Sequence, residues 1–165
     1  MPLDGWDAIS PVSAIPPTRA PALVNFVPDQ AGIQVREGYA AWSSGLTSAA
    51  IESIFTWEGP TSRKMYSAVS SSIFETTSAG AVGAAALSGL TNARWQQTMF
   101  SNSAGNFLVI CNGADSVRNY DGTSWTTPTI TGGTSSTFIS VAVHQRRLWF
   151  AQVSTARAWY LAHAP

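Results

Sequence analysis

Apolar and polar residues alternate in short runs along most of this chain, and polar turns separate the runs. Three stretches read as strand, polar turn, strand, short turn and strand: 51–77, 95–125 and 138–162. Phe55, Met99 and Val143 fall at equivalent places near the end of the first strand of each stretch, about 44 residues apart. A period of this size is typical of repeated four-strand units, so the pattern predicts repeated small antiparallel sheets.

The two faces of the predicted strands both carry apolar groups. Phe55 and Trp57 share one face of the first strand, whereas Ile54 lies on the other. The run "FLVIC" (107–111) is apolar on both faces, as expected for a strand between two adjacent sheets. We therefore expect a mainly β fold of short antiparallel four-strand-like units that resemble the blades of a β-propeller, with too few units to close one.

Two glycine-containing pairs predict tight hairpin turns in the second stretch. Asn112-Gly113 and Asp121-Gly122 each place a glycine where a turn requires positive φ. The intervening strands are then only a few residues long, which suits the outer strands of a small sheet.

The first part of the chain is rich in proline and is predicted to form an extended arm, residues 1–32, ahead of a repeated β domain, residues 33–165. Six of the nine prolines lie at positions 2, 11, 16, 17, 21 and 28, and each fixes φ and removes a hydrogen-bond donor. Large apolar residues lie between them, which is unusual for a solvated tail. We therefore expect Trp6, Ile15, Leu23 and Phe26 to contact another surface, such as a neighbouring subunit. A first hairpin or clasping strand is predicted in 32–44, with its turn at Glu37-Gly38.

Composition favours a packed globular protein that is covered by partners. The chain has 165 residues, of which 45% are hydrophobic and only 11% are charged. Nine basic residues balance nine acidic ones, so there is no net positive field to attract nucleic acid or an anionic membrane. Cys111 is the single cysteine, which excludes an internal disulfide and fits a reducing cytoplasm.

No segment predicts a membrane span. The longest stretch of small apolar residues, 79–90, is much shorter than the about 20 residues that a bilayer requires. Its three glycines weaken a helix, so we expect a loop between sheets.

The sequence offers no catalytic motif, and we expect neither enzymatic activity nor a cofactor or metal. His144 and His163 lack a carboxylate or cysteine at a ligand-like spacing. Asp115, Asn119 and Asp121 do not match a calcium loop and are explained by turn formation. Arg146 and Arg147 are adjacent and could contact a phosphate, although an exposed turn explains them better.

Taken in order, several motifs resemble the N-terminal part of the tail hub, or packaged-DNA stabilisation, proteins of short-tailed bacteriophages and of the related propeller-bearing nozzle proteins. The motifs are a Pro-rich opening with "LVNFVPD" (23–29), "VREGYAAW" (35–42), "MYSAVSSSIFE" (65–75), "NFLVICNGAD…YDGTSW" (106–125) and "RRLWFAQ" followed by "AWYL" (146–161).

The resemblance implies a structural virion protein of a bacteriophage tail, assembled in the bacterial cytoplasm. Such a protein forms a ring of identical subunits beneath the portal or its adaptor, continues the DNA conduit without sequence specificity, and helps to retain the packaged genome. Proteins of this kind are usually several hundred residues long, whereas three units cannot close a propeller. The chain is then a fragment, or another copy or chain completes the set of sheets, or the sheets pack differently.

The alternative function is a carbohydrate-binding or sialidase-like β-propeller module. The segment "YDGTSW" (120–125) resembles an aspartate-box turn, and the tryptophans could form a surface that stacks on sugars. Packing between sheets explains Trp57, Trp95, Trp125 and Trp149 better than a sugar-binding surface does, because they recur at strand or turn positions. No arginine triad or Tyr-Glu pair can be assigned for sialidase chemistry.

Overall fold

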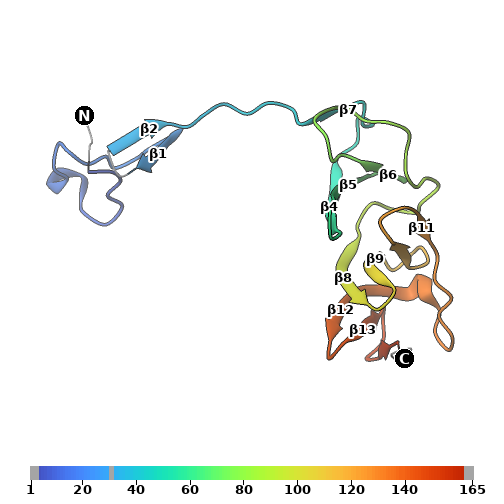
Figure 1. The fold of residues 1–165 in the computed structure, drawn as a ribbon. Coiled ribbons are helices and arrows are strands. Elements are labelled where there is room, and N and C mark those ends of the chain that lie inside the picture. Colours follow the sequence, from blue (N-terminus) through green and yellow to red (C-terminus); the bar gives the residue numbers. More distant parts are fainter. Residues whose placement is uncertain (1–3, 30–31, 162–165) are drawn as a thin grey trace. The chain divides into compact units, whose positions relative to one another are not determined.

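The computed structural model describes residues 4–29 and 32–161. The chain divides into two compact units, Met1–Ala41 and Trp42–Pro165, and each is considered by itself. Figure 1 shows the strands of both units. His163 and the last residues of the third predicted stretch lie outside the described residues.

The first unit contains a 3-10 turn, η1 (Val12–Ala14), and an antiparallel pair, β1 (Phe26–Asp29) and β2 (Gly32–Val35). It does not run extended throughout, contrary to the expectation for a Pro-rich arm. The N–H of Asp4 donates to the carbonyl of Thr18 at 2.8 Å, and the N–H of Asp7 donates to that of Ala20 at 3.0 Å, so the segment folds back on itself. Proline restricts φ but leaves neighbouring residues free to turn, which is why the chain can reverse between prolines.

The predicted hairpin with a turn at Glu37-Gly38 is wrong. β2 pairs instead with β1, which precedes it, and Phe26 lies opposite Val35. Residues 36–41 form no strand. Pro28 is compatible with this pairing because both strands of a two-stranded sheet are edge strands. A proline is tolerated in an edge strand at a position whose backbone N faces away from the partner strand, since no hydrogen bond between the strands is lost there.

The second unit is built mainly of three small antiparallel sheets, which confirms the mainly β prediction. The first sheet contains β4 (Ile51–Glu58), β5 (Arg63–Val69) and β6 (Ser72–Glu75). The second contains β8 (Gln96–Asn102), β9 (Gly105–Cys111), β10 (Arg118–Tyr120) and β11 (Trp125–Thr126). The third follows a 3-10 turn, η2 (Ser135–Thr137), and contains β12 (Phe138–His144), β13 (Arg147–Gln152) and β14 (Ala158–Tyr160). Only the second sheet has the four strands expected of each, and residues 42–161 form no β-propeller.

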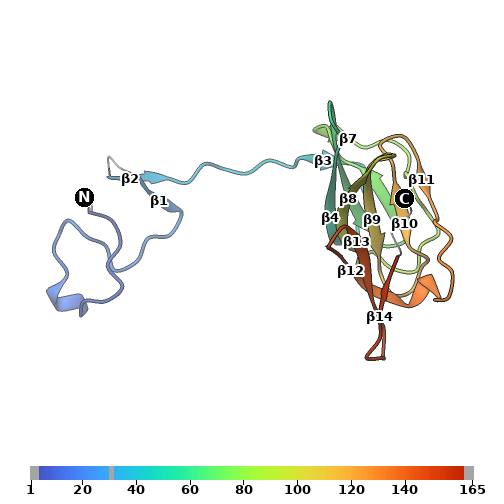
Figure 2. The same ribbon diagram turned by 60° about the horizontal axis from the view of Figure 1, so that its bottom comes forward.

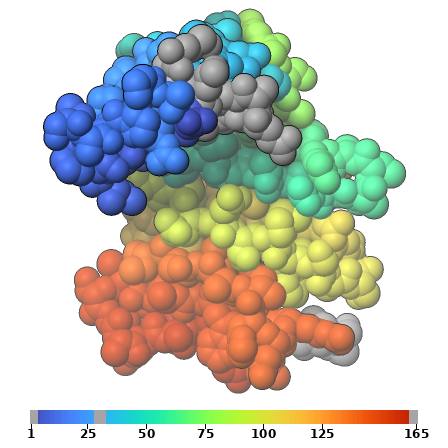
Figure 3. Space-filling view, turned by 90° about the vertical axis from the view of Figure 1, so that its left-hand side faces the viewer, coloured from blue at the N-terminus to red at the C-terminus, as the bar shows by residue number. Residues whose placement is uncertain are grey.

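The three sheets follow one another in chain order, and Figure 3 shows them as successive bands from green through yellow to orange. Their first strands are neighbours, since β8 contacts both β4 and β12 (Figure 2). One hydrophobic cluster includes side chains of the first and second sheets, and a separate cluster includes side chains of the second and third. The second sheet is therefore buried on both faces.

Strand β9 contributes side chains to both hydrophobic clusters. Leu108 and Ile110 belong to the cluster with the first sheet, whereas Val109 and Cys111 belong to the cluster with the third. All four side chains are at most 4% exposed. The predicted position of "FLVIC" between two sheets is confirmed, because side chains alternate between faces along a strand.

The predicted equivalence of Phe55 and Met99 is wrong. Phe55 is buried in the cluster between the first and second sheets, and Met99 packs against the same cluster from the opposite side. Two residues that face each other across one interface cannot occupy matching positions in successive sheets of a stack. A shift of one residue turns a side chain to the other face, so a repeat read from spacing alone does not fix the face.

The stretch 79–90 is a loop, as predicted. It contains only the two-residue strand β7 (Gly80–Ala81), which pairs in parallel with β3 (Ser43–Ser44), and an isolated bridge from Leu87 to Ile73. Within the described residues, no helix has the length and apolar character needed to cross a membrane.

Candidate functional site

The first unit exposes large apolar side chains and buries almost none. Trp6 is 64% exposed and Ile9 is 96% exposed, and Phe26 is also exposed. Ile15 and Leu23 are half-buried. The buried positions of the described part of this unit are Gly5, Asp7 and Ala20. The four residues predicted to contact another surface therefore lie in a segment that has no hydrophobic core of its own.

A buried carboxylate holds the fold of this first unit. The backbone N–H groups of Ser10 and Ile9 donate to Oδ1 of Asp7 at 2.9 and 3.1 Å, and they hold the pKa of Asp7 below its usual value. The guanidinium of Arg19 lies 3.5 Å from the other carboxylate oxygen. Polar contacts, and not apolar packing, thus shape the backbone that carries the exposed side chains.

Arg146 and Arg147 lie at the tight turn between β12 and β13, and both are exposed. The two turn residues have positive φ, 48° at Gln145 and 60° at Arg146, although neither is glycine. This is the two-residue turn that matches the twist of paired strands, and it is strained for residues with a Cβ. His144 is the last residue of β12 and directly precedes this turn.

The hairpin places Arg147 on an aromatic surface. Its guanidinium lies 5.1 Å from the ring centre of Tyr160, within the range of a cation–π contact. Tyr160 in turn lies 5.1 Å from the ring centre of Trp149, which is opposite it on the neighbouring strand. We call Arg147, Trp149 and Tyr160 the outer aromatic patch. It lies on the face of the third sheet opposite to that of Leu148 and Phe150, which are buried against the second sheet.

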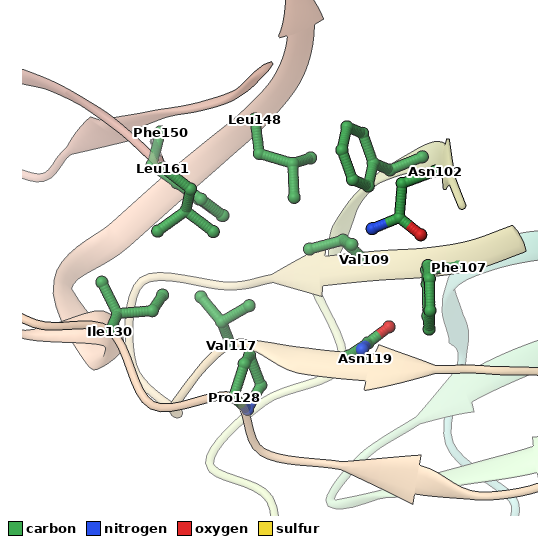
Figure 4. Close-up of a pocket in the computed structure, with 11 residues that line it drawn as sticks. Asn102, Phe107, Val109, Val117, Asn119, Pro128, Ile130, Leu148, Phe150 and Leu161 are labelled. Carbon is green, nitrogen blue, oxygen red and sulfur yellow. The ribbon is translucent and has the colours of Figure 1, made fainter. Parts of the chain in front are cut away.

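A pocket of about 180 Å³ lies between the second and third sheets (Figure 4). Its walls are mostly apolar and come from both sheets, chiefly from Phe100, Phe107, Val109, Val117, Leu148 and Phe150. Pro128 and Ile130, in the loop after β11, complete the apolar part together with Leu161. Asn102 and Asn119 are the polar residues of the lining.

The two asparagines of the lining lie toward the same end of this pocket. Figure 4 places Asn102 and Asn119 toward one end and Ile130 and Leu161 toward the other. The side-chain oxygen Oδ1 of Asn119 is buried and has no hydrogen-bond partner within the described part of the chain. An unpartnered buried acceptor is unfavourable for stability.

A second hollow, of about 340 Å³, lies beside Trp125 and is more polar. Lys64 and Glu75 form an ion pair at its border, 3.4 Å apart, and Tyr66, Tyr120 and Trp125 contribute aromatic rings. Burial, followed by a hydrogen bond in which Tyr120 is the acceptor, raises the pKa of Tyr66 far above its usual value. The Tyr66 hydroxyl therefore stays protonated at neutral pH and cannot act there as a phenolate nucleophile.

Asp115 and Asp121 stabilise turns, as predicted, whereas the prediction of a turn at Asn119 is wrong because Asn119 lies on strand β10. Asp115 accepts hydrogen bonds from Asn112 and from both the N–H and the hydroxyl of Thr91. Asp121 accepts the backbone N–H groups of Thr123 and Ser124, each at 2.8 Å. In the described ranges no group of three or more His, Cys, Asp and Glu residues could hold a metal ion.

Sequence reasoning missed the pocket between the second and third sheets. The sequence presents Asn119 as a turn residue, and Leu148 and Phe150 as strand residues. A polar residue opposite Val109, in a strand next to "FLVIC", is the one signal that could have drawn attention to it. The pocket itself depends on how two sheets meet, which no local pattern encodes.

Comparison with known proteins adds no relative: no family model, no curated protein and no solved structure matches the chain.

Proposed function

We propose that this chain is a structural protein of a bacteriophage tail or head-to-tail connection, where it forms part of a ring that continues the DNA conduit and helps to retain packaged DNA. The observation that carries the proposal is the first unit, which exposes large apolar side chains and has no apolar core. Such a segment is stable in water only when another surface covers it. In a ring, that surface belongs to the neighbouring subunit.

The second unit supports assembly independently. Its middle sheet is covered on both faces, whereas the third sheet leaves the outer aromatic patch uncovered. Tyr160 is 51% exposed and Trp149 is half-buried. Tyrosine, tryptophan and arginine are enriched at protein–protein interfaces, and the outer aromatic patch contains one of each. The patch therefore favours a protein partner, such as the next subunit, a portal protein or an adaptor.

The charge of the chain fits a conduit. Equal numbers of acidic and basic residues leave no net charge, and the exposed positions of β8 are uncharged: Gln96, Gln97, Ser101 and Asn102. A surface that made many contacts to phosphates would hold the DNA in place, because each contact increases the affinity of the protein for DNA. A surface with few positive charges lets DNA pass.

The test measures two properties: the oligomeric state of the purified chain and the retention of DNA in phage particles. The full chain should sediment as a ring-sized oligomer at micromolar concentration. The double variant Ile9→Asp with Val12→Asp removes two exposed apolar groups from the first unit and should shift the protein to monomers. Phage particles assembled with this variant should lose packaged DNA.

A matched control separates charge from apolar contact. Ser13→Asp with Ala14→Asp adds the same charge in the 3-10 turn that contains Val12, at two exposed residues, but removes no large apolar group. It should retain the oligomer. A monomeric wild-type chain, together with particles that keep their DNA and tails without it, would contradict the proposal.

The carbohydrate-binding alternative is favoured by the hollow beside Trp125. An aromatic ring next to a charged pair, Lys64 and Glu75, is a combination that can bind a sugar through stacking and hydrogen bonds. Trp125 also packs against Tyr66 and Tyr120, with ring centres 5.2 and 5.1 Å apart, so its loss would disturb the interior.

The variant to use is therefore Glu75→Gln, which keeps the shape of the hollow and removes one charge. Saturable binding on a glycan array that Glu75→Gln weakens would favour this alternative over the virion protein. An array without a binder would leave the ring proposal in place.

A further inference from the structure

We propose that Asn112 is a modification site: it deamidates through Gly113 when the contact between the second and third sheets opens, and the carboxylate that forms beside Asp115 keeps that contact from closing again. This inference does not depend on the proposed function. It rests on the residue that follows Asn112 and on the hydrogen bonds that hold both residues in the folded chain.

Asn112 is the only asparagine of the chain that is followed by glycine. A glycine has no Cβ to shield its backbone nitrogen, and it moves freely in an open chain. In the reaction the nitrogen of Gly113 gives up its proton to solvent and attacks Cγ of Asn112. The new N–C bond closes a succinimide ring, and the side-chain amide leaves as ammonia. Water then opens the ring at either carbonyl, which leaves aspartate or isoaspartate at this position.

The folded chain restrains the attacking nitrogen. The N–H of Gly113 donates to the carbonyl of Phe138 at 2.8 Å. Gly113 follows β9 of the second sheet, and Phe138 is the first residue of β12 in the third, so this hydrogen bond joins the two sheets. A Cβ at Gly113 would collide with Ile139, which shows how closely the two segments pack. The nitrogen can attack only after this contact has opened, because its proton must leave and the backbone must turn.

The side chain of Asn112 is restrained as well. Its Oδ1 accepts the backbone N–H groups of Ala114 and Asp115 at 3.1 and 2.7 Å. Its Nδ2 donates to Oδ2 of Asp115 at 2.6 Å and to Oδ1 of Asn92 at 3.3 Å. Both ends of the amide are therefore held, and the group cannot rotate toward the nitrogen of Gly113. Deamidation of the folded protein is limited to the fraction of molecules in which this network is open.

The product does not fit the closed contact. An aspartate in place of Asn112 has no donor for Asp115, and it places a second carboxylate at the distance of the former hydrogen bond. Two carboxylates this close cannot both be ionised without a large penalty, so the closed contact loses stability at neutral pH. Isoaspartate also adds an atom to the main chain before Gly113 and displaces its N–H from Phe138. Each modified molecule therefore opens more readily than an unmodified one.

The experiment compares the full chain in buffer with the same chain unfolded in urea, at one mildly alkaline pH and one temperature. Peptide mass spectrometry measures the conversion of Asn112 over time. We expect the folded chain to convert at least about tenfold more slowly, which corresponds to a contact that is open in no more than about a tenth of the molecules. Asn102, which is followed by serine, is the internal control and should convert more slowly than Asn112 in urea. Equal rates in the folded and unfolded chains, or no conversion in urea, would overturn the proposal.

Two matched variants identify the contact that opens. Phe150→Ala removes a ring that stacks on Phe138 in the cluster between the second and third sheets, with ring centres 4.9 Å apart. Phe55→Ala removes an equally buried ring from the separate cluster between the first and second sheets. Phe150→Ala should accelerate conversion of Asn112 in the folded chain by about tenfold or more, and Phe55→Ala should accelerate it clearly less. Equal acceleration would show that unfolding of the whole unit controls the reaction and would overturn the proposal. Phe150→Leu and Phe55→Leu make the same comparison with a smaller loss of packing if the alanine variants do not fold.

A second pair of variants tests the effect of the product. Asn112→Asp introduces the carboxylate directly, and Asn112→Ser removes the amide without adding charge. At neutral pH Asn112→Asp should unfold at a lower temperature than Asn112→Ser, because only the aspartate repels Asp115. The thiol of Cys111, buried in the cluster between the second and third sheets, should also react faster with dithionitrobenzoate in Asn112→Asp. An Asn112→Asp chain that is as stable as Asn112→Ser, with an equally protected thiol, would overturn the proposal.

Discussion

Gly122 faces the ring of Trp57 so closely that a Cβ at this glycine would lie 2.5 Å from Cζ2 of the tryptophan. Gly122 belongs to the turn between β10 and β11 in the second sheet, whereas Trp57 lies on β4 in the first. The indole N–H of Trp57 donates to the carbonyl of Asn106 at 2.9 Å, so the ring is held in place. The contact between the turn glycine and the core tryptophan thus sets how closely the first and second sheets pack.

Replacement of Gly122 by alanine should lower the free energy of unfolding by about 2–4 kcal/mol, because it adds a clash with Trp57 to the strain of a positive φ of 101°. Gly89→Ala is the control. Gly89 has a φ of 71° but no heavy atom within 4 Å of its Cβ position, so only the backbone strain of about 1–2 kcal/mol applies. Urea denaturation of both variants measures the difference, and equal losses would show that the contact with Trp57 has no energetic effect.

The strained turn between β12 and β13 can be relieved. Replacing Gln145-Arg146 with Asn-Gly should raise the free energy of unfolding by about 1 kcal/mol, because both positions have positive φ and this pair adopts the required turn readily. The single variants Gln145→Asn and Arg146→Gly should each contribute part of the gain. Thermal unfolding followed by circular dichroism provides the measurement, and an unchanged or lower midpoint would contradict the expectation.

Asp115 should make stability depend on pH at acidic values. Partial burial alone would raise the pKa of its carboxyl, but hydrogen bonds from Asn112 and Thr91 outweigh burial and lower the pKa below 3.8. The folded state therefore favours the ionised form. This stabilisation is present above the ordinary pKa of about 3.9 and is lost as the pH falls through the lower value of the folded state.

Asp115→Asn should accordingly reduce the free energy of unfolding by about 1–2 kcal/mol at neutral pH, and the difference from wild type should shrink between about pH 5 and pH 2. The control is Glu58→Gln, which breaks an exposed ion pair with Arg63 and should change stability by less than about 0.5 kcal/mol. Denaturation series at several pH values give both curves. A difference that stays constant with pH would show that the charge of Asp115 is not involved.

Cys111 should be unreactive in the folded protein. The side chain is fully buried, and burial raises the pKa of its thiol to about 12, so the thiolate is scarce near neutral pH. A thiol reagent such as dithionitrobenzoate should label the protein only after unfolding in guanidinium chloride. Rapid labelling of the native chain would indicate frequent opening of the interface between the second and third sheets.

Much of the fold could be predicted because its signals are local. The alternation around Phe55, the doubly apolar run that includes Leu108 and Val109, and the glycine at position 122 each identify a strand or a turn from a few adjacent residues. Side-chain direction along a strand and the sign of φ in a turn are set by the backbone itself, so they appear in the sequence without knowledge of distant contacts.

Which strands pair with one another was harder to predict from the sequence. β2 pairs with β1 and not with the segment after Glu37, because the choice depends on which ladder aligns better and not on the strand pattern alone. For the same reason, their spacing suggests that Phe55 and Met99 occupy equivalent strand positions, although both side chains lie at the interface between the first and second sheets.

The sequence by itself determined the short strands, their apolar faces, the turns and the low content of charged residues. Only the tertiary structure decided which faces meet, and therefore where the outer aromatic patch and the pocket at Asn119 lie. Local conformation follows from steric and hydrogen-bonding rules within a few residues. Packing between sheets depends on contacts between residues more than 40 positions apart, such as the hydrogen bond from the Trp57 side chain to the Asn106 carbonyl, and it is fixed only when the whole chain has folded.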